Sequence, residues 1–255
     1  MVELKTDESI DAMRAAGRVV AHALAAVRDH ACPGLSLVEL DEVARAVLRE
    51  AGASSPFLGY RPRFAPVPFP AVVCASVNDA IVHGVPGRYR LRDGDLVSID
   101  CGAKLGGWVG DAAVSFTVGR ARPADLRLIE TTEAALAAGI AAAVPGNRIG
   151  DIAHAIGTVG RAAGYGIPEG FGGHGIGRRM HEEPGVPNEG PPGRGMRLRP
   201  GMVLAIEPML TAGGTDDYTC DPDGWTLRTT DGSRAAHAEH TVAITADGPR
   251  ILTAL

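Results

Sequence analysis

The chain is poor in the features that mark disulfide-rich, zinc-finger, membrane-spanning and secreted proteins. Its four cysteines, Cys32, Cys74, Cys101 and Cys220, form no CxxC pair and lie too far apart for a disulfide framework or a zinc finger. The Ala-rich stretch 134–144 is too short to cross a bilayer, and the first residues lack the apolar segment of a signal peptide. We therefore expect a soluble, cytoplasmic protein with reduced thiols and no membrane partner.

Positive charge is also scarce. The 255 residues carry a formal net charge of −5, which argues against a nucleic-acid partner, because such proteins usually present a dominant basic surface. The hydrophobic content of 45% is ordinary for a globular protein and is enough for a sizeable core. The 34 glycines and 18 prolines mark turns between apolar segments. The composition therefore predicts a globular protein with many turns.

Apolar residues recur at helical spacing in two pairs of segments. Three helix starts are recognisable: Thr6 as an N-cap, Ser36 with a capping box from Glu39, and Pro123 at a first helical position. Helices are predicted between residues 6 and 32, 36 and 52, 123 and 144, and 149 and 164. Short β-branched runs predict strands at 71–77, 96–103 and 108–118, the last two joined by a turn at 106–107.

The order of these elements repeats along the chain. Residues 32–52 align without a gap on residues 144–164, at an offset of 112, and both segments contain a Pro-Gly pair near the start and an Ala-Gly pair near the end. In each half, two helices precede a His-Gly pair and two strands that carry carboxylates. This order predicts an internal duplication within one domain, 1–255, with approximate halves 1–120 and 121–255.

Each half carries two carboxylates at matching positions of its apolar runs. Asp100 follows Leu-Val-Ser-Ile and Glu207 follows Val-Leu-Ala-Ile, whereas Asp111 and Glu239 each begin a second run. A charge at the end of an apolar strand is expensive unless a partner compensates it. Because crowded carboxylates repel each other, we expect these four, with His174, to hold two divalent cations that share bridging carboxylates. One imidazole among oxygen ligands favours manganese, iron(II) or cobalt, with zinc as a further candidate.

The chain resembles the type I methionine aminopeptidases over essentially its whole length. The motifs that carry the resemblance occur in the family's order, and they are Val77-Asn-Asp-Ala-Ile-Val-His-Gly-Val-Pro86, Asp100 with Asp111, Gly173-His-Gly-Ile-Gly-Arg-Arg-Met-His-Glu-Glu-Pro184, Ile206-Glu-Pro-Met209 and Glu239-His-Thr-Val. The resemblance implies an α+β fold of the pita-bread (creatinase/aminopeptidase) type. In that fold two pseudo-twofold α/β halves form a curved antiparallel sheet, with a dimetal site between them.

The resemblance also implies what the site does. The single catalytic domain would remove N-terminal methionine by hydrolysis, favouring a small second residue, from peptides and nascent proteins. Asp111 and Glu239 match the carboxylates that bridge two metal ions, Asp100 matches a ligand of one ion, and His174 and Glu207 match ligands of the other. The ions would be cobalt, manganese, iron(II), nickel or zinc.

Further residues match the family's catalytic and substrate-binding positions. Glu207 matches the proton shuttle, His181 the imidazole that contacts the substrate carbonyl, and His83 the histidine beside the scissile amide and the free amine. The residues that match the walls of the methionine pocket are Tyr60, Cys74 and Trp225.

The chain departs from the family's pattern near this pocket. A proline-rich stretch makes the segment between Tyr60 and Cys74 longer than in familiar members, and Met180 stands where an aromatic residue is common. Alternating prolines at 62–70 predict a semi-rigid loop without regular secondary structure. This loop is interpreted either as a spacer or as a wall of a substrate site.

Two other functions remain in competition. The first is an Xaa-Pro aminopeptidase or prolidase-like metallopeptidase of the same fold, which normally adds an N-terminal domain that we do not expect here. The second is a catalytically inactive pita-bread protein that serves as a binding module, although such relatives lose metal ligands that this chain retains. We expect a monomer, and arginines such as Arg178 and Arg179 are either solvated loop charges or contacts to the ribosome.

Overall fold

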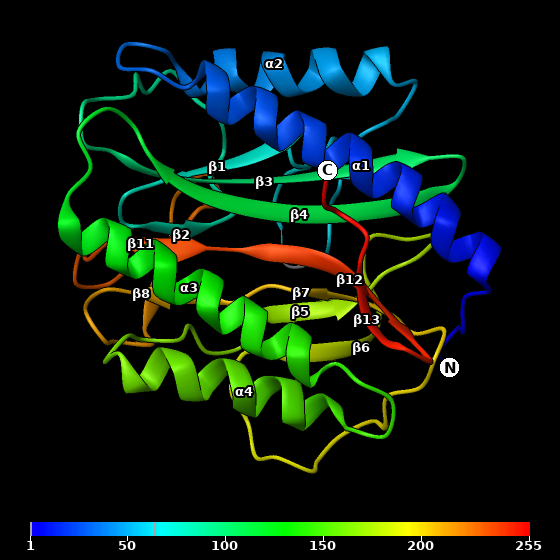
Figure 1. The fold of residues 1–255 in the computed structure, drawn as a ribbon. Coiled ribbons are helices and arrows are strands. Elements are labelled where there is room, and N and C mark those ends of the chain that lie inside the picture. Colours follow the sequence, from blue (N-terminus) through cyan, green and yellow to red (C-terminus); the bar gives the residue numbers. More distant parts are fainter. Residues whose placement is uncertain (1, 64) are drawn as a thin grey trace.

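The computed structural model describes residues 2–63 and 65–255. Its helices come in two pairs, as the periodicity predicted, and Figure 1 shows one pair above and one below the strands. The helices are α1 (Asp7–His30), α2 (Leu37–Glu50), α3 (Pro123–Ala142) and α4 (Ile149–Ala162). None of the helices in the described residues is long and apolar enough to span a membrane.

The helix starts follow the predicted caps. The Thr6 hydroxyl accepts a hydrogen bond from the Ser9 amide at 3.2 Å, and Ser36 and Glu39 form the capping box at the start of α2. Pro123 opens α3. Because these residues satisfy or avoid free amide groups at the first turn, each helix begins where its local sequence dictates.

The strands are short, except for one long hairpin in the first half. They are β1 (Val73–Val77), β2 (Ala80–Val82), β3 (Leu96–Leu105), β4 (Trp108–Thr117), β5 (Gly172–Gly175), β6 (Glu182–Pro187), β7 (Val203–Ile206), β8 (Met209–Thr211), β9 (Tyr218–Cys220), β10 (Leu227–Thr229), β11 (Ala235–His237), β12 (Glu239–Thr245) and β13 (Gly248–Ile251). The hairpin β3–β4 turns at Gly106-Gly107, as predicted.

The main sheet joins the two halves of the chain edge to edge. Its order is β1-β3-β4-β12-β7-β5-β6, with β13 attached to β12, and the pairs between these strands are antiparallel. Strands from the first half lie on one side of the β4–β12 seam and strands from the second half lie on the other (Figure 1). At the seam, the Thr241 hydroxyl donates to the Asp111 carbonyl oxygen at 2.8 Å and accepts from the Asp111 amide at 2.9 Å. The internal duplication stays a prediction, and the placement of each half on its own side of the seam agrees with it.

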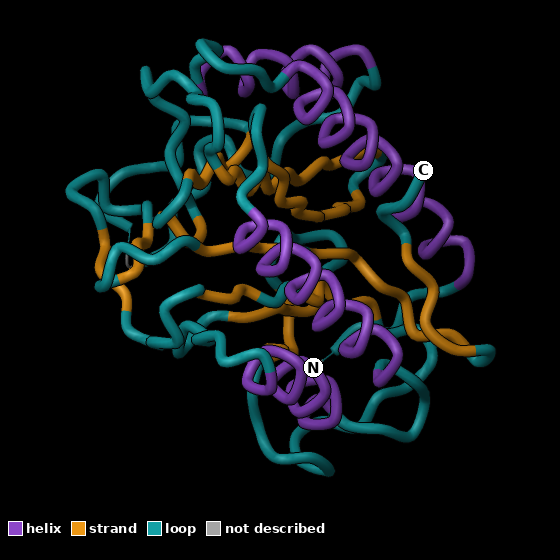
Figure 2. Tube along the Cα trace, turned by 60° about the vertical axis from the view of Figure 1, so that its left-hand side comes forward, coloured by secondary structure: helices purple, strands orange, loops and turns teal. Residues whose placement is uncertain are grey.

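The helix pairs cover the outer face of the sheet and bury two main cores (Figure 2). Helix α1 packs on β3 and β4, and α2 packs on α1 and β1, whereas α3 and α4 pack on strands of the second half. Helix α1 approaches β4 so closely that a Cβ at Gly110 would lie 2.8 Å from the Gly17 Cα. Glycine at this crossing therefore lets helix and strand backbones touch.

Asp100 and Asp111 lie inside strands, as the predicted strands 96–103 and 108–118 imply. Asp100 ends the apolar run of β3 but not the strand, because β3 continues to Leu105, and β4 begins at Trp108. Both are ten-residue strands of one hairpin. In the second half Glu207 follows β7 and Glu239 opens β12, as predicted.

The proline-rich segment has no helix or strand in its described residues, as predicted. Phe64 lies outside the described residues. The segment still has fixed contacts, because the Arg61 guanidinium donates to the Pro66 carbonyl oxygen at 2.9 Å.

Candidate active site

All the side chains predicted for the site line one cavity of about 260 Å³. They are Tyr60, Cys74, His83, Asp100, Asp111, His174, His181, Glu207, Trp225 and Glu239. The cavity lies where the two halves meet, since its residues come from strands on both sides of the seam. The structure therefore brings together residues that are up to 179 positions apart, from Tyr60 to Glu239.

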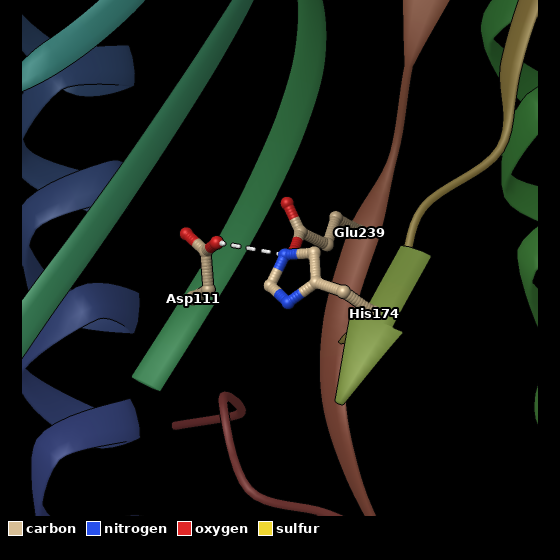
Figure 3. A group of neighbouring side chains, drawn as sticks. All are labelled: Asp111, His174 and Glu239. Carbon is tan, nitrogen blue, oxygen red and sulfur yellow. Dashed lines mark ion pairs between the residues drawn. The ribbon is translucent and has the colours of Figure 1, made fainter. Parts of the chain in front are cut away.

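Asp111, His174 and Glu239 form the first compact group of candidate metal ligands. One ligand atom from each lies within 4.8 Å of the others, and all three side chains are buried. Figure 3 shows one nitrogen of the His174 ring facing the Asp111 and Glu239 carboxylates, and Nε2 lies 3.9 Å from the Asp111 Oδ2. His174 Nδ1 is 2.9 Å from the Gly175 carbonyl oxygen. That contact favours a proton on Nδ1 and leaves a lone pair on Nε2, which points toward the carboxylates.

A second group shares Glu239 with the first. It consists of Glu207, His237 and Glu239, again within 4.8 Å of one another. Glu207 also approaches the first group, because its Oε1 lies 3.6 Å from the His174 Nε2. Asp100 belongs to neither compact group, although it lines the same cavity.

The carboxylates of the site strongly disfavour being charged together. Burial, followed by repulsion from neighbouring carboxylates, raises the pKa of Asp111 and of Glu239 well above its usual value. Burial likewise raises the pKa of Asp100 to about 7 and the pKa of Glu207 to about 8. A divalent cation relieves this cost by replacing the protons with positive charge.

The imidazoles of the site are held in the neutral form. Burial, together with a smaller contribution from nearby histidines, lowers the pKa of His174 to about 3 and the pKa of His83 to about 4. Burial also lowers the pKa of His181 and of His237. Neutral imidazoles keep a nitrogen lone pair, which is the form that binds metal ions.

Unsatisfied polar atoms show that a cation fits this donor set. Among the described residues, several buried atoms at the site have no hydrogen-bond partner: Asp100 Oδ1, Asp111 Oδ1, Glu239 Oε1 and His237 Nε2. Buried polar atoms are normally paired, so unpaired ones need an explanation. Three of them are carboxylate oxygens, which accept hydrogen bonds but cannot donate them when the carboxylate is ionised. Oxygen donors with imidazole nitrogen are ligands that first-row divalent metals accept.

Aromatic rings form the apolar wall of the cavity. The Trp225 ring centroid lies 5.1 Å from that of Phe69 and 6.4 Å from that of Tyr60. Phe57 completes this wall by an edge contact with Phe69 at 6.4 Å. The Cys74 thiol is buried at the same wall, and burial, with the nearby carboxylates, raises its pKa well above the usual value. The wall is therefore suited to an apolar side chain.

Local backbone geometry positions the two histidines outside the ligand set. His83 follows β2 in a left-handed conformation, with a φ of 58°, and its ring lies 5.9 Å from that of Phe171. His181 lies in the loop between β5 and β6, with its ring 4.3 Å from His174 and 5.3 Å from Tyr60. Both rings therefore face the same cavity as the carboxylates.

The sequence interpretation missed several residues of the site. His237 is the main one, because it is 2% exposed and joins a candidate ligand group. A usable signal was its position two residues before Glu239, at the end of an apolar run. Other cavity-lining residues that were not predicted are Phe57, Phe69, Phe171 and Met209. Their apolar side chains carry no chemical signature in the sequence.

Comparison with known proteins agrees with this site. The model of metallopeptidase family M24 matches residues 11–246. Methionine aminopeptidase 1 of Mycobacterium tuberculosis is 56% identical over 260 residues, which cover 99% of this chain and 95% of that protein. The methionine aminopeptidase of Aquifex aeolicus is 44% identical over 257 residues, which cover 100% of this chain and 99% of that protein.

Solved structures support the same assignment. The methionine aminopeptidase of Thermotoga maritima superposes with a TM-score of 0.95 at 38% identity and covers 100% of both chains. A prolidase from Pyrococcus furiosus superposes with a TM-score of 0.79 at 23% identity, covering 99% of this chain and 65% of that chain, which shows a shared fold alone. The predicted pita-bread fold is thus confirmed. The chain belongs to metallopeptidase family M24 and, within it, to the methionine aminopeptidases.

Proposed function

We propose that this chain removes N-terminal methionine by hydrolysis from peptides and nascent proteins. The observation that carries the proposal is a single cavity in which unpartnered buried carboxylate oxygens adjoin an apolar aromatic wall. Membership of a metallopeptidase family implies the use of a divalent metal. The carboxylates provide the place for the cation and the aromatic wall provides the place for the methionine side chain.

Two divalent ions are proposed, because four buried carboxylates with raised pKa values line one cavity, and two cations relieve their mutual repulsion. We assign Asp111 and Glu239 as bridging ligands, Asp100 to one ion, and His174 and Glu207 to the other. Cobalt, manganese, iron(II), nickel and zinc are the candidate ions. When bound, such ions polarise a carbonyl and ease the deprotonation of a water molecule.

The remaining steps fall to the protein side chains. With the cations bound, the Glu207 carboxylate accepts a proton from the attacking water and passes it on toward the leaving amine. His181 donates a hydrogen bond to the scissile carbonyl oxygen as negative charge develops there. His83 holds the scissile amide and the free amine at the other side of the cavity.

Substrate selectivity follows from the walls of the cavity. Tyr60, Cys74 and Trp225 would enclose the unbranched methionine side chain. The rings of His83 and Phe171, 5.9 Å apart, crowd the cavity near the proposed amide position, which favours a small second residue. We further propose that the enzyme works as a cytoplasmic monomer on chains emerging from the ribosome.

A peptide panel tests the proposal. Metal-loaded enzyme is incubated with Xaa-Ala-Ser peptides in which Xaa is Met, Leu, Ala or Lys, and the released amino acid is quantified. We expect kcat/KM for the Met peptide to exceed that for Ala by about tenfold or more, since burial of each methylene in an apolar pocket adds about 1 kcal/mol or more. Equal cleavage of the Lys and Met peptides would refute the proposed specificity.

A further inference from the structure

His237 is fixed at the seam between the two halves by its backbone. It is the last residue of β11 and pairs with Met209 of β8. Its amide donates to the Ser115 hydroxyl at 3.0 Å, and that hydroxyl donates to the His237 carbonyl oxygen at 2.8 Å. Ser115 belongs to β4, the strand that carries Asp111. The His237 side chain is therefore anchored relative to the carboxylates of both halves.

The imidazole of His237 reaches the carboxylates without bonding to them. It is 2% exposed, and its Nε2 has no hydrogen-bond partner among the described residues. This nitrogen lies 3.5 Å from the Glu207 Oε2 and 3.9 Å from the Glu239 Oε2. Leaving a buried imidazole nitrogen unpaired is costly, so its placement here needs a partner that the protein itself does not supply.

The spacing of these atoms is that of ligands around one ion. Nitrogen and carboxylate oxygen ligands lie roughly 2.0–2.2 Å from a first-row divalent ion, so two neighbouring ligands at tetrahedral or octahedral angles lie about 2.8–3.6 Å apart. The distance from the His237 Nε2 to the Glu207 Oε2, 3.5 Å, falls in this interval, and the distance to the Glu239 Oε2, 3.9 Å, lies slightly above it. The distance from the His174 Nε2 to the other Glu207 oxygen, 3.6 Å, falls there as well. Glu207 thus stands between two imidazoles, one from β5 and one from β11.

We propose that His237 is a further metal ligand, binding through Nε2 the cation that Glu207 and Glu239 hold. The inference rests on the metal centre of the proposed function and adds a second imidazole to it. A second nitrogen makes the donor set softer, which shifts its preference from manganese toward cobalt, nickel and zinc. This changes the expectation from the sequence, which counted one imidazole.

Proton NMR of the Co²⁺-loaded protein tests the assignment directly. A histidine bound through Nε2 keeps an exchangeable Nδ1–H close to the paramagnetic ion, and its resonance is strongly shifted. We expect two such shifted N–H resonances in the wild-type protein, from His174 and His237, and one in His237→Gln. His154→Gln, the same change on the exposed face of α4, is the matched control and should keep both.

Calorimetric titration with Co²⁺ and with Mn²⁺ provides a second readout that does not depend on activity. His237→Gln should weaken Co²⁺ binding about tenfold to a hundredfold, and Mn²⁺ binding less, with circular dichroism confirming the fold. The wild-type spectrum decides the question even where the variant fails to fold. A single shifted N–H in wild type, or weaker binding in His237→Gln with both resonances retained, overturns direct ligation. Wild-type protein that binds neither metal instead overturns the proposed function.

Discussion

The Trp225 indole Nε1–H donates to the backbone oxygen of Val67 at 3.0 Å. This hydrogen bond ties the proline-rich segment of the first half to the cavity wall of the second half. Pro66 reinforces it by packing on Gly224, where an added Cβ would lie 2.3 Å from the Pro66 Cγ. Phe69, at the end of the segment, contacts the Trp225 ring edge to face. The segment is therefore a wall of the cavity, which was the second of the two interpretations left open by the sequence.

Replacing the indole tests how much this wall matters for substrate binding. Trp225→Phe keeps an aromatic ring but removes the donor to Val67, a loss of about 1 kcal/mol. We expect KM for Met-Ala-Ser to rise about fivefold with little change in kcat, because the loosened wall holds the methionine less well. Steady-state kinetics measure both constants. An unchanged KM would show that the segment does not shape the pocket.

The Asp100 ligand assignment predicts a joint loss of metal and activity. Asp100→Asn removes a charge while keeping the shape of the side chain, so bound metal measured by atomic emission and the rate of methionine release should both collapse, the latter about a hundredfold or more. Asp217→Asn, the same change on an exposed loop, is the control and should match wild type in both. Full activity in Asp100→Asn would remove this residue from the ligand set.

Much of the fold was accessible from the sequence because local signals agree with tertiary structure. Thr6, Ser36 and Pro123 mark helix starts by satisfying or removing free amides, and these interactions depend only on neighbouring residues. The end of β3 was less accessible. Where a strand stops depends on its partner strand, and β3 continues past the predicted end at residue 103 because β4 pairs with it as far as Leu105.

For the site, too, local sequence signals were readable and contacts between distant residues were not. Asp111, His174 and Glu239 were identifiable because their motifs recur in a known family, and the structure places them in one group. His237 was missed because its position two residues before Glu239 does not by itself distinguish a ligand from a buried strand residue. It is identified as a candidate ligand by the approach of its Nε2 to Glu207, which lies 30 residues away in the chain. The roles assigned to His83 and His181 remain predictions.

The backbone beside His83 should tolerate no side chain. A Cβ at Gly84 would lie 2.3 Å from the carbonyl oxygen of Ala75 in β1, so Gly84→Ala must push the segment after β2 away from β1 and should destabilise the protein by about 3 kcal/mol. Gly87→Ala is the matched control, because its nearest contact, the Val85 oxygen, would be 3.9 Å away. Urea unfolding compares the two. Equal stability of both variants would contradict the close approach of His83 and its neighbours to β1.

The ion pair between Lys5 and Glu182, beside His181, should make the free energy of unfolding depend on pH in the acidic range. Glu182 accepts hydrogen bonds from the Lys5 ammonium at 2.9 Å and from the Arg178 and Arg179 amides. Burial raises the pKa of Glu182, but these partners outweigh it and hold the pKa below its ordinary value of 4.5. At pH values above 4.5 the ionised carboxylate therefore makes its full contribution to stability. This contribution is lost as the pH falls through the lowered pKa.

Urea unfolding between pH 6 and pH 3 checks this dependence. Wild type should lose more stability over the interval than Glu182→Gln, which has no carboxylate to protonate at this position. The exposed neighbour Glu183 offers the control variant Glu183→Gln, which should follow wild type. If Glu182→Gln loses as much stability as wild type, the Lys5–Glu182 pair makes no net contribution.

A competition between two peptides shows whether this cavity acts on N-terminal methionine. Metal-loaded enzyme receives equal amounts of Met-Ala-Ser and Ala-Pro-Ala, and mass spectrometry follows both over time. We expect release of methionine from the first peptide while the second stays intact, because the wall around Trp225 binds an apolar first residue. Cleavage of Ala-Pro-Ala with Met-Ala-Ser left intact would contradict it and would favour the prolidase-like alternative.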